Sequence, residues 1–430
     1  MTAVALVSGK RAASTEARIV TVGLRRGMGI FLVLISALML FTFGLAVSPH
    51  DETTFQLTSM YSTAWYLAPL HFPVRETSIV MAAVCAALGI WLVIRRQTRG
   101  SYFIFSVGIV LFLWSFLAWA ARNNSLNLVG MIGVTLISAV PIIFGSMSGV
   151  MCERSGVINV AIEGQFLMGA FIAAMIASAS GNLWLGLVCG ALAGGLLGGL
   201  LAFLSLRYAA DQIIVGIVIN AFALGLTNYL TDTLLVPYQN TLNSGPIFSP
   251  IAIPVLDKIP IIGPDIFDQN LFVYIAAILL VALTTGLFRT RWGLRVRAVG
   301  EHPEAAETVG IRVLSVRYRN VIWGGVIAGI GGAAFTIGST GEFSSDMTAG
   351  LGFVALAAMI FGRWRPYGGL LAALLFGFSN SLQATLAVLN VPINSNILIM
   401  APYLITIAVV SGLVGRVRAP ANDGKPYRPQ

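Results

Sequence analysis

The sequence predicts an all-α, polytopic membrane protein with about twelve transmembrane helices and both termini on the cytoplasmic side. Mean hydropathy over the 430 residues is +0.86, and 57% of the residues are hydrophobic. Only 10% of the residues are charged, against roughly 25% in soluble domains. Apolar stretches of about 20 residues, the length that crosses a bilayer, recur along the chain. A soluble core could not bury this much apolar surface, which favours the membrane class.

Twelve apolar stretches are candidate spans, and they follow one another through most of the chain. They cover 28–48, 77–94, 102–121, 127–150, 157–180, 183–206, 212–231, 270–288, 320–340, 349–362, 367–389 and 394–415. The 349–362 stretch is short and could be a half-span. The first stretch resembles a signal peptide because Arg25 and Arg26 precede it. Its apolar core exceeds the roughly 7–15 residues of a cleaved signal, so we expect a retained first span.

The distribution of Lys and Arg predicts the orientation. If the N-terminus is cytoplasmic and all twelve stretches cross, 23 of the 26 Lys and Arg lie inside, and only Arg75, Arg122 and Lys258 lie outside. Cytoplasmic loops carry such an excess of basic residues. The same topology explains the net charge of +9 and the pI of about 9.8, so no nucleic-acid partner is expected.

This topology divides the chain into several parts. We expect a basic cytoplasmic tail at 1–27, two N-terminal helices in 28–100, a helical core at 101–415 and a cytoplasmic tail at 416–430. Within the core, 232–269 is rich in Pro and lies outside. It could be a landing surface for another protein or a plain connector.

Motifs of enzymes and metal sites are missing from the sequence. It contains no G-x-x-x-x-G-K-[ST], no H-E-x-x-H and no G-x-S-x-G. None of its three His lies in a predicted span, and its three Cys show no metal spacing. We therefore expect no catalytic residues, no metal site and no cofactor bound by this chain.

The stretch "CERSGVINVAIEGQF" (152–166) predicts a break in a membrane helix. Gly156 and Gly164 could permit a bend, and Asn159 and Glu163, four residues apart, would share a helix face. Broken helices are common at transporter binding sites because the freed backbone groups line a polar cavity. Glu163 is the one clear ionisable residue within a predicted span, and such residues are usually functional. An ordinary cytoplasmic turn is the alternative.

Asn and Gln side chains are also frequent in the predicted spans. They suit a neutral, hydrogen-bonding solute, or they could fix the helices by interhelical hydrogen bonds of about 0.6 kcal/mol each. The candidate residues of a translocation pathway or gate are Glu153, Gly156, Asn159, Glu163, Gly164, Gln212, Asn220 and Asn380.

Gly186, Gly190, Gly194 and Gly198 recur every four residues and form one helix face. Such a face lets two backbones approach closely. The stretch 325–334 has similar small-residue spacing. Two related halves or a chance likeness of Gly-rich helices would both explain this similarity.

The stretch "RAVGEHPEAAETVGI" (297–311) predicts a short helix between two spans, on the cytoplasmic side. Pro303 suits the first turn of a helix, and Gly310 is a natural stop. Two turns are not stable alone, so the helix needs a partner. We expect the less polar side, with Ala305, Ala306 and Val309, to pack against a cytoplasmic motor. The candidate coupling residues are Gly300, Glu301, Pro303, Glu304, Ala305, Ala306, Val309 and Gly310.

These motifs resemble the permease subunits of ATP-binding-cassette (ABC) importers, in the branch of branched-chain amino acid, simple-sugar and nucleoside systems. "RAVGEHPEAAETVGIRV" is similar to the coupling segment of that family, here 289–319, and "ERSGVINVAIEG" to the signature of its nucleoside-type members. Asn159 and Glu163 favour nucleosides, because sugar-type members usually read more like G-I-D-L-S-V-G. "ADQIIVGIVINAFALGLTNYL" is a third match, and the resemblance covers roughly 105–415. Ala161 departs from the pattern, since a Gly is common there.

The resemblance implies a machine with several other parts. A second permease subunit completes the pathway, and a cytoplasmic ABC ATPase, which carries ATP and Mg, binds the coupling segment. An extracytoplasmic solute-binding protein, often a lipoprotein, delivers the solute. The expected place is the cytoplasmic membrane, with membrane lipid around the helices, and the expected function is nucleoside import. The alternatives are a simple sugar or other small polar solute and, in a different class, a secondary transporter.

Overall fold

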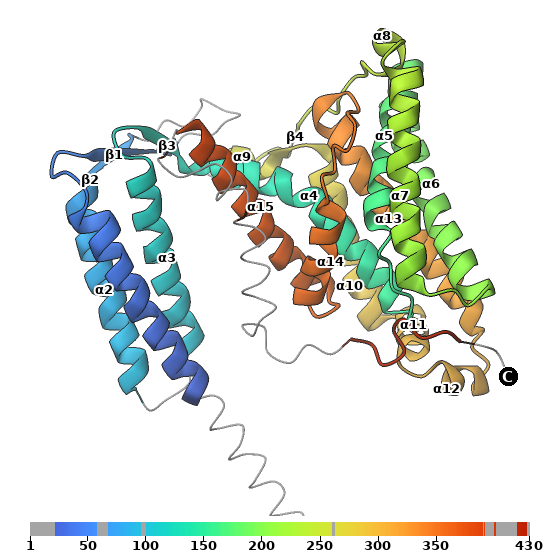
Figure 1. Ribbon diagram of the computed structural model, residues 1–430, viewed down its shortest axis with the longest axis horizontal. Coiled ribbons are helices and arrows are strands. Elements are labelled where there is room, and N and C mark those ends of the chain that lie inside the picture. The colour runs from blue at the N-terminus through green and yellow to red at the C-terminus, as the bar shows by residue number, and fades with distance from the viewer. Residues whose placement is uncertain are drawn as a thin grey trace, which may run out of the picture. The chain divides into compact units, whose positions relative to one another are not determined.

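The structure is a computed structural model, and it describes residues 22–57, 68–95, 100–259, 263–389, 391, 400 and 419–427. Most of these residues are helical, with a few short strands (Figure 1). They form two compact units. Of the described residues, the first unit holds 22–57, 68–95, 100–129, 386–389 and 391, and the second holds 130–259, 263–385, 400 and 419–427.

Ten helices within the described ranges are long and apolar enough to cross a membrane. They are Val22–Leu45, α2 (Val74–Ile94), α3 (Ser101–Ala120), α4 (Leu128–Glu153), α5 (Ile162–Ser180), α6 with its π-helical end (Leu183–Arg207), α7 with its π-helical end (Gln212–Leu235), α10 (Leu271–Arg289), α13 with its π-helical end (Val313–Thr340) and α15 (Pro366–Val388). A shorter apolar helix, α14, covers Leu351–Phe361. These helices coincide with eleven of the twelve predicted stretches, and the short one falls where a half-span was expected. The predicted 394–415 span lies outside the described residues, so the count of twelve stays a prediction.

The first unit packs three helices around small residues: Val22–Leu45, α2 and α3. A Cβ on Gly29 would lie 2.7 Å from the Gly89 carbonyl oxygen, so the backbones of the first helix and α2 nearly touch. A Cβ on Gly108 of α3 would lie 2.6 Å from a methyl of Leu32. The sequence placed α3 with the core, whereas the structure groups it with the two preceding helices.

A small sheet closes one end of this unit. β1 (Glu52–Gln56) pairs antiparallel with β2 (Leu70–Pro73) and parallel with β3 (Ser125–Asn127), in the order β2-β1-β3. Phe55 of β1 is fully buried, and its ring lies 5.0 Å from that of Trp114. The aromatic contact fixes the sheet onto α3.

In the second unit, α5, α6 and α13 pack backbone against backbone and lie side by side in Figure 1. The predicted glycine face of α6, Gly186–Gly198, forms this contact. A Cβ on Gly190 would lie 2.7 Å from Gly169 O of α5, and one on Gly198 would lie 2.7 Å from Val321 O of α13. The expected close approach is confirmed, because no larger side chain fits at these positions. Whether the two Gly-rich stretches are true repeats stays a hypothesis.

Short elements connect the helices of the second unit. They are α8 (Gln239–Leu242), β4 (Ile251–Ala252), α9 (Gly263–Phe267), β5 (Asp268–Gln269), α11 (Arg291–Glu301) and α12 (Pro303–Thr308). β4 and β5 pair antiparallel inside the predicted outer loop 232–269. The Tyr274 hydroxyl lies 2.7 Å from Ile251 O and 2.8 Å from Phe267 O, which ties this part of the loop to α10.

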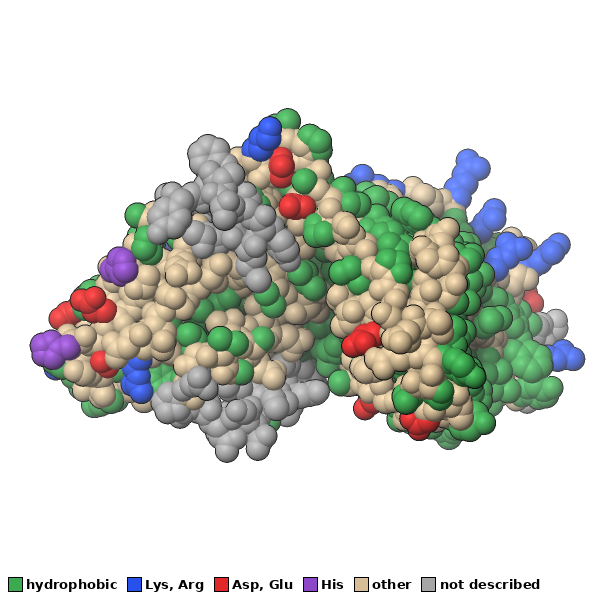
Figure 2. All heavy atoms as spheres, turned by 90° about the horizontal axis from the view of Figure 1, so that it is seen from above, with side chains coloured by type: hydrophobic (Ala, Val, Ile, Leu, Met, Phe, Trp, Pro, Cys, Tyr) green, Lys and Arg blue, Asp and Glu red, His purple; other side chains and the backbone are tan. Residues whose placement is uncertain are grey.

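Hydrophobic side chains cover much of the outer surface of the helices of the second unit, and Lys and Arg side chains project beyond them (Figure 2). Leu196, Val218, Ile278 and Leu371 are among the most exposed large apolar residues, and they come from four different long helices. Such a continuous apolar exterior fits lipid rather than water as the surrounding solvent.

Candidate functional site

A helix break between α4 and α5 is the first part of the candidate site. Residues 154–161 join the two helices without continuing either of them. Gly156 has φ +88°, a backbone conformation that glycine adopts without strain. A Cβ at this position would also lie 2.8 Å from the Arg317 guanidinium. Residues 154–161 fit both the predicted break and the alternative of a cytoplasmic turn between two spans, so the reading as a broken helix stays a prediction, and Gly156 is required at the start of this segment.

Two amides of α7 hold the break in place. Asn220 donates from Nδ2 to Val160 O at 2.9 Å and accepts from Gly164 N at 2.8 Å. Gln212 accepts from Ile158 N at 2.8 Å. Buried backbone groups outside a helix must find partners inside the protein. These side chains supply three such partners from one neighbouring helix.

Asn159 lies inside the break and is fully buried. Its Nδ2 donates to Ser148 Oγ at 3.1 Å and to Gln165 Oε1 at 3.0 Å, while Gln165 donates back at 3.3 Å. The two amides therefore satisfy each other. Glu153, the last residue of α4, is also buried and accepts from Trp364 Nε1.

The buried carboxylate of Glu163 binds the start of the half-helix α14. It accepts from Thr348 Oγ1 at 2.5 Å, from Gly350 N at 2.9 Å and from Gly352 N at 2.6 Å. The first N–H groups of a helix have no partner within the helix, and the helix start favours a negative charge. Glu163, at the start of α5, thus caps a helix that lies almost 190 residues further along the chain.

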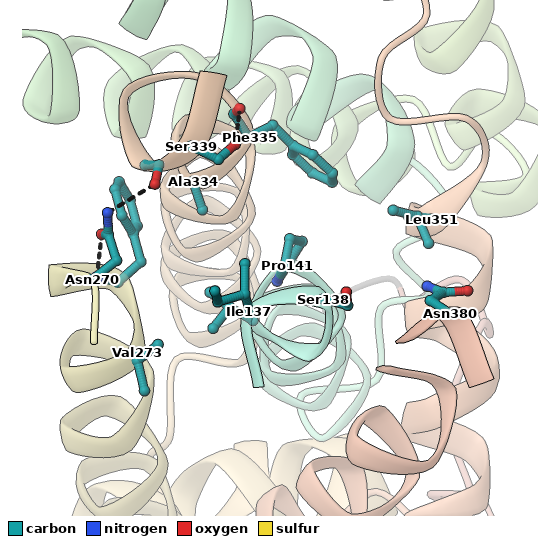
Figure 3. Close-up of a pocket in the computed structure, with 13 residues that line it drawn as sticks. Ile137, Ser138, Pro141, Asn270, Val273, Ala334, Phe335, Ser339, Leu351 and Asn380 are labelled. Carbon is teal, nitrogen blue, oxygen red and sulfur yellow. Dashed lines mark hydrogen bonds between the residues drawn. The ribbon is translucent and has the colours of Figure 1, made fainter. Parts of the chain in front are cut away.

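A pocket of about 210 Å³ lies among α4, α10, α13, α14 and α15 (Figure 3). Its wall is mostly apolar and includes the ring of Phe335. Asn270 and Asn380 lie on opposite sides of it, with Ser138 between them in this view. The Asn270 amide is committed to Phe248 O at 3.0 Å and Gly338 O at 2.8 Å. The Asn380 side chain makes no hydrogen bond to a described residue, so its amide in the pocket wall is available to a ligand.

The break and the pocket are connected through α14. Leu351, the first residue of α14, lines the pocket, and Glu163 binds the N–H groups on either side of it. Seven of the eight predicted pathway residues gather at the break: Glu153, Gly156, Asn159, Glu163, Gly164, Gln212 and Asn220. Asn380 alone lies in the pocket wall. Sequence reasoning missed Asn270, which reads as the end of a loop, and Phe335, which reads as one more apolar residue.

The 289–319 segment contains the short helices α11 and α12, and the end of α11 lies against the break. α12 begins at Pro303, and Gly310 has φ +82° just beyond its end, as predicted. Glu304, Ala305 and Val309 are exposed, Val309 at 74%. The outward side of α12 is therefore small and mixed in polarity.

Ala306 departs from the expected arrangement. It was placed on the docking side, but it is only 3% exposed and packs with Val299, Val313 and Tyr427 of the same chain. The prediction that Ala306 faces a partner is wrong. Two turns leave room for a single inward face, and Pro303 and Ala306 occupy it. The coupling role of the segment stays a prediction.

A family model described as "Branched-chain amino acid transport system / permease component" matches residues 131–409. The chain belongs to this permease family. The match includes the break, the pocket and α12, and it begins just after the first unit of the permease. Together with its ten apolar helices, this makes the permease a multi-pass membrane protein.

The chain is similar along most of their length to several ABC transporter permease proteins. The guanosine ABC transporter permease protein NupQ of Bacillus subtilis is 37% identical over 302 residues, which are 68% of this chain and 94% of NupQ. The nucleoside ABC transporter permease protein NupC of Lactococcus lactis is 38% identical over 303 residues, with the same two shares. The putative glucose ABC transporter permease protein TsgC13 of Haloferax volcanii is 31% identical over 309 residues, which are 67% of this chain and 93% of TsgC13. No solved structure matches the chain.

Proposed function

We propose that this chain is the transmembrane permease subunit of an ABC importer that moves nucleosides across the cytoplasmic membrane. The observation that carries the proposal is the similarity to NupQ and NupC over 94% of their lengths. ATP and Mg are bound by a partner ATPase, and the chain itself catalyses no reaction. A second permease subunit and an extracytoplasmic solute-binding lipoprotein complete the machine.

The pocket is the proposed solute path. A nucleoside is neutral and carries both donors and acceptors on a flat aromatic base. The free amide of Asn380 can bond to either kind of group, and the Phe335 ring offers an apolar face to the base. A path needs weak, reversible contacts, so one uncommitted amide among apolar walls suits passage better than a tight polar cage.

The break is the proposed gate, and Glu163 is the residue that positions it. Its carboxylate joins α5 to the half-helix α14 at the pocket edge. The amides of Asn220 and Gln212 hold the break against α7. In this arrangement the predicted pathway residues act by shaping the gate, and Asn380 acts by touching the solute.

The exposed side of α12 is the proposed contact with the ATPase. Glu304, Ala305 and Val309 provide its surface, while Pro303 and Ala306 anchor it to the permease. Gly300, at the end of α11, packs against the Arg154 carbonyl of the break. A push on α11 and α12 would therefore reach the gate.

Both termini and the segment 289–319 are proposed to be cytoplasmic, with 232–269 outside. Ser249 and Ser315 are both exposed and suit cysteine labelling. A membrane-impermeant thiol reagent applied to whole cells should modify Ser249→Cys and spare Ser315→Cys. The reverse labelling pattern would overturn the orientation.

Reconstitution tests the function itself. The permease would be assembled in proteoliposomes with the ATPase, second permease and lipoprotein encoded beside it. Uptake of labelled guanosine, adenosine and uridine would then be compared with uptake of glucose, ribose and leucine. We expect ATP-dependent uptake of nucleosides above that of the other solutes. Preferential uptake of glucose, the solute in the name of TsgC13, would favour the sugar alternative. Uptake without ATP would indicate a secondary transporter.

A further inference from the structure

The described C-terminal residues 419–427, here called the strap, run along the α11–α12 region. Ala421 N donates to Glu301 Oε2 at 3.2 Å, and Asn422 N donates to Gly300 O at 2.9 Å. The Tyr427 hydroxyl bonds to the Glu307 carboxylate of α12. Backbone and side chain together therefore bind the strap to both helices of the proposed coupling segment.

The strap also binds the base of α13. Arg317 is fully buried, and its guanidinium donates to Lys425 O at 3.2 Å and to Asn422 Oδ1 at 3.1 Å. The same guanidinium lies 5.7 Å from the centre of the Tyr427 ring. A buried arginine needs such partners because an unpaired buried charge is costly. The strap supplies acceptors that α13 by itself does not.

The strap also contacts residues 154–161, the break between α4 and α5. The carboxyl groups of Asp423 and Glu153 lie close enough to interact electrostatically. A Cβ on Gly424 would lie 2.6 Å from Ile158 Cδ1. A Cβ on Gly156 would lie 3.1 Å from Asn422 O. The strap backbone therefore touches the break at van der Waals distance.

We propose that the strap is a transmission element, which passes the movement of α12 to the helix break, and that Tyr427 and Asn422 are its positioning residues. The proposal rests on the proposed function, because it assumes that an ATPase moves α12. A segment that binds α12 through Tyr427 and packs against the break at Asn422 and Gly424 cannot leave one unmoved when the other shifts, unless these contacts break. The hydrogen bonds from Arg317 to Asn422 and Lys425 hold the middle of the strap against α13.

If the strap only stabilises the fold, substitutions in it should lower ATPase recruitment, ATP hydrolysis and uptake together. If the strap transmits movement, they should lower the amount of solute transported per ATP hydrolysed. Tyr427→Phe removes the hydroxyl that binds Glu307 and keeps the ring that covers Ala306 and Arg317. Asn422→Ala removes one acceptor of Arg317. Tyr229→Phe is the matched control, because Tyr229 is 64% exposed on α7.

The experiment uses the complete transporter in proteoliposomes and measures three quantities: ATPase co-purification, solute-stimulated ATP hydrolysis and nucleoside uptake. In Tyr427→Phe and Asn422→Ala we expect normal ATPase recruitment and continued hydrolysis, with uptake per ATP reduced at least threefold. Tyr229→Phe should match the unmodified protein. An unchanged ratio in both variants, or a parallel loss of all three quantities, would overturn the proposal. Failure of the proposed function is distinct, because the unmodified transporter would then take up no nucleoside.

Discussion

The Glu163 carboxylate accepts a hydrogen bond from Gly350 N at 2.9 Å, and this contact joins the helix break to the half-helix at the pocket. Gly350 has φ +79° and precedes the first residue of α14. The Glu163 oxygens thus accept the hydrogen bonds that the carbonyl groups of a preceding helical turn would accept, because α14 starts inside the protein. The carboxylate that the sequence analysis assigned to the pathway or gate binds the start of α14.

Glu163→Gln should destabilise this end of α14. A Gln amide keeps one acceptor oxygen and turns the other acceptor into a donor, so at least one of the three groups that bond to Glu163 loses its partner. A buried N–H without a partner costs about 1–3 kcal/mol. We expect a lower midpoint of thermal unfolding in detergent and reduced uptake. Glu342→Gln, at an exposed position in the loop before α14, should change neither, and an equal effect of both substitutions would contradict the assignment.

The glycine face of α6 offers a paired test on one helix. A Cβ on Gly194 would lie 2.6 Å from Gly329 Cα, whereas a Cβ on Gly199 has its nearest neighbour at 3.8 Å. Gly194→Ala should therefore lower the free energy of unfolding by about 1–3 kcal/mol, the usual cost of overpacking. Gly199→Ala should be neutral or slightly stabilising, since Ala favours helix by up to about 1 kcal/mol. Denaturant titration of both variants checks the difference, and equal stability would show that the helices can separate freely.

The two faces of α12 predict opposite outcomes for neighbouring substitutions. Ala305→Trp alters the exposed side and should reduce co-purification of the ATPase without changing the thermal stability of the permease alone. Ala306→Trp forces a large ring beneath Tyr427 and should lower that stability first, by about 1–3 kcal/mol. Measuring stability and recruitment in parallel separates the two effects. Normal recruitment in Ala305→Trp would rule out this side of α12 as the contact.

Asn380 is expected to contact the solute. Asn380→Leu keeps a similar size and removes the amide, so the concentration of nucleoside that gives half-maximal uptake should change at least several-fold at normal expression. Gln383→Leu, three residues further along α15 and outside the pocket lining, should leave uptake unchanged. If both variants behave alike, the pocket is not the path.

The strap should respond to pH. Burial raises the pKa of Asp423 to about 6, from an ordinary value of 3.8, and the interaction with Glu153 and the charge of Arg317 partly offset this rise. A carboxyl with a raised pKa stabilises the docked state most at pH values below its ordinary pKa, and this contribution is lost as the pH rises through about 6.

Spin labels at Glu304 and Lys425, both exposed, report strap docking as a distance distribution. The distribution should broaden between pH 4.5 and pH 7.5, values chosen about 1.5 units either side of the raised pKa. Asp423→Asn should remove most of this change. The same broadening in Asp423→Asn would assign the pH response to another group.

The membrane-spanning helices could be predicted from the sequence because each depends on a local property, about 20 apolar residues in a row. The end of α4 near Gly156 and the start of α12 at Pro303 were also predictable, since both residues act through their own backbone geometry. The role of Glu163 was not, because its partners Thr348, Gly350 and Gly352 lie almost 190 residues away.

Burial of Ala306 was equally hidden from sequence analysis. Periodicity shows which residues share a face of α12, and it does not show which face turns inward. Tyr427 decides that question from more than 100 residues further along the chain. The 419–427 strap carried no apolar pattern, so nothing in its composition indicated a structural part. A single sequence does not reveal which polar residues that lie far apart along the chain contact one another in the site.

The seam among α5, α6 and α13 has a mechanical consequence. Where helices contact one another through large side chains, one helix can shift along its neighbour when these side chains change rotamer. The contacts of the α6 glycines with α5 and α13 are to backbone atoms, which have no rotamers to change. We expect the three helices to travel as one rigid body through the transport cycle. Torsional change is then confined to two hinges, residues 154–161 and the loop that precedes α14. We expect such an importer to open its pathway alternately to the two sides of the membrane by backbone rotation at these hinges, while the α5–α6–α13 body keeps its shape.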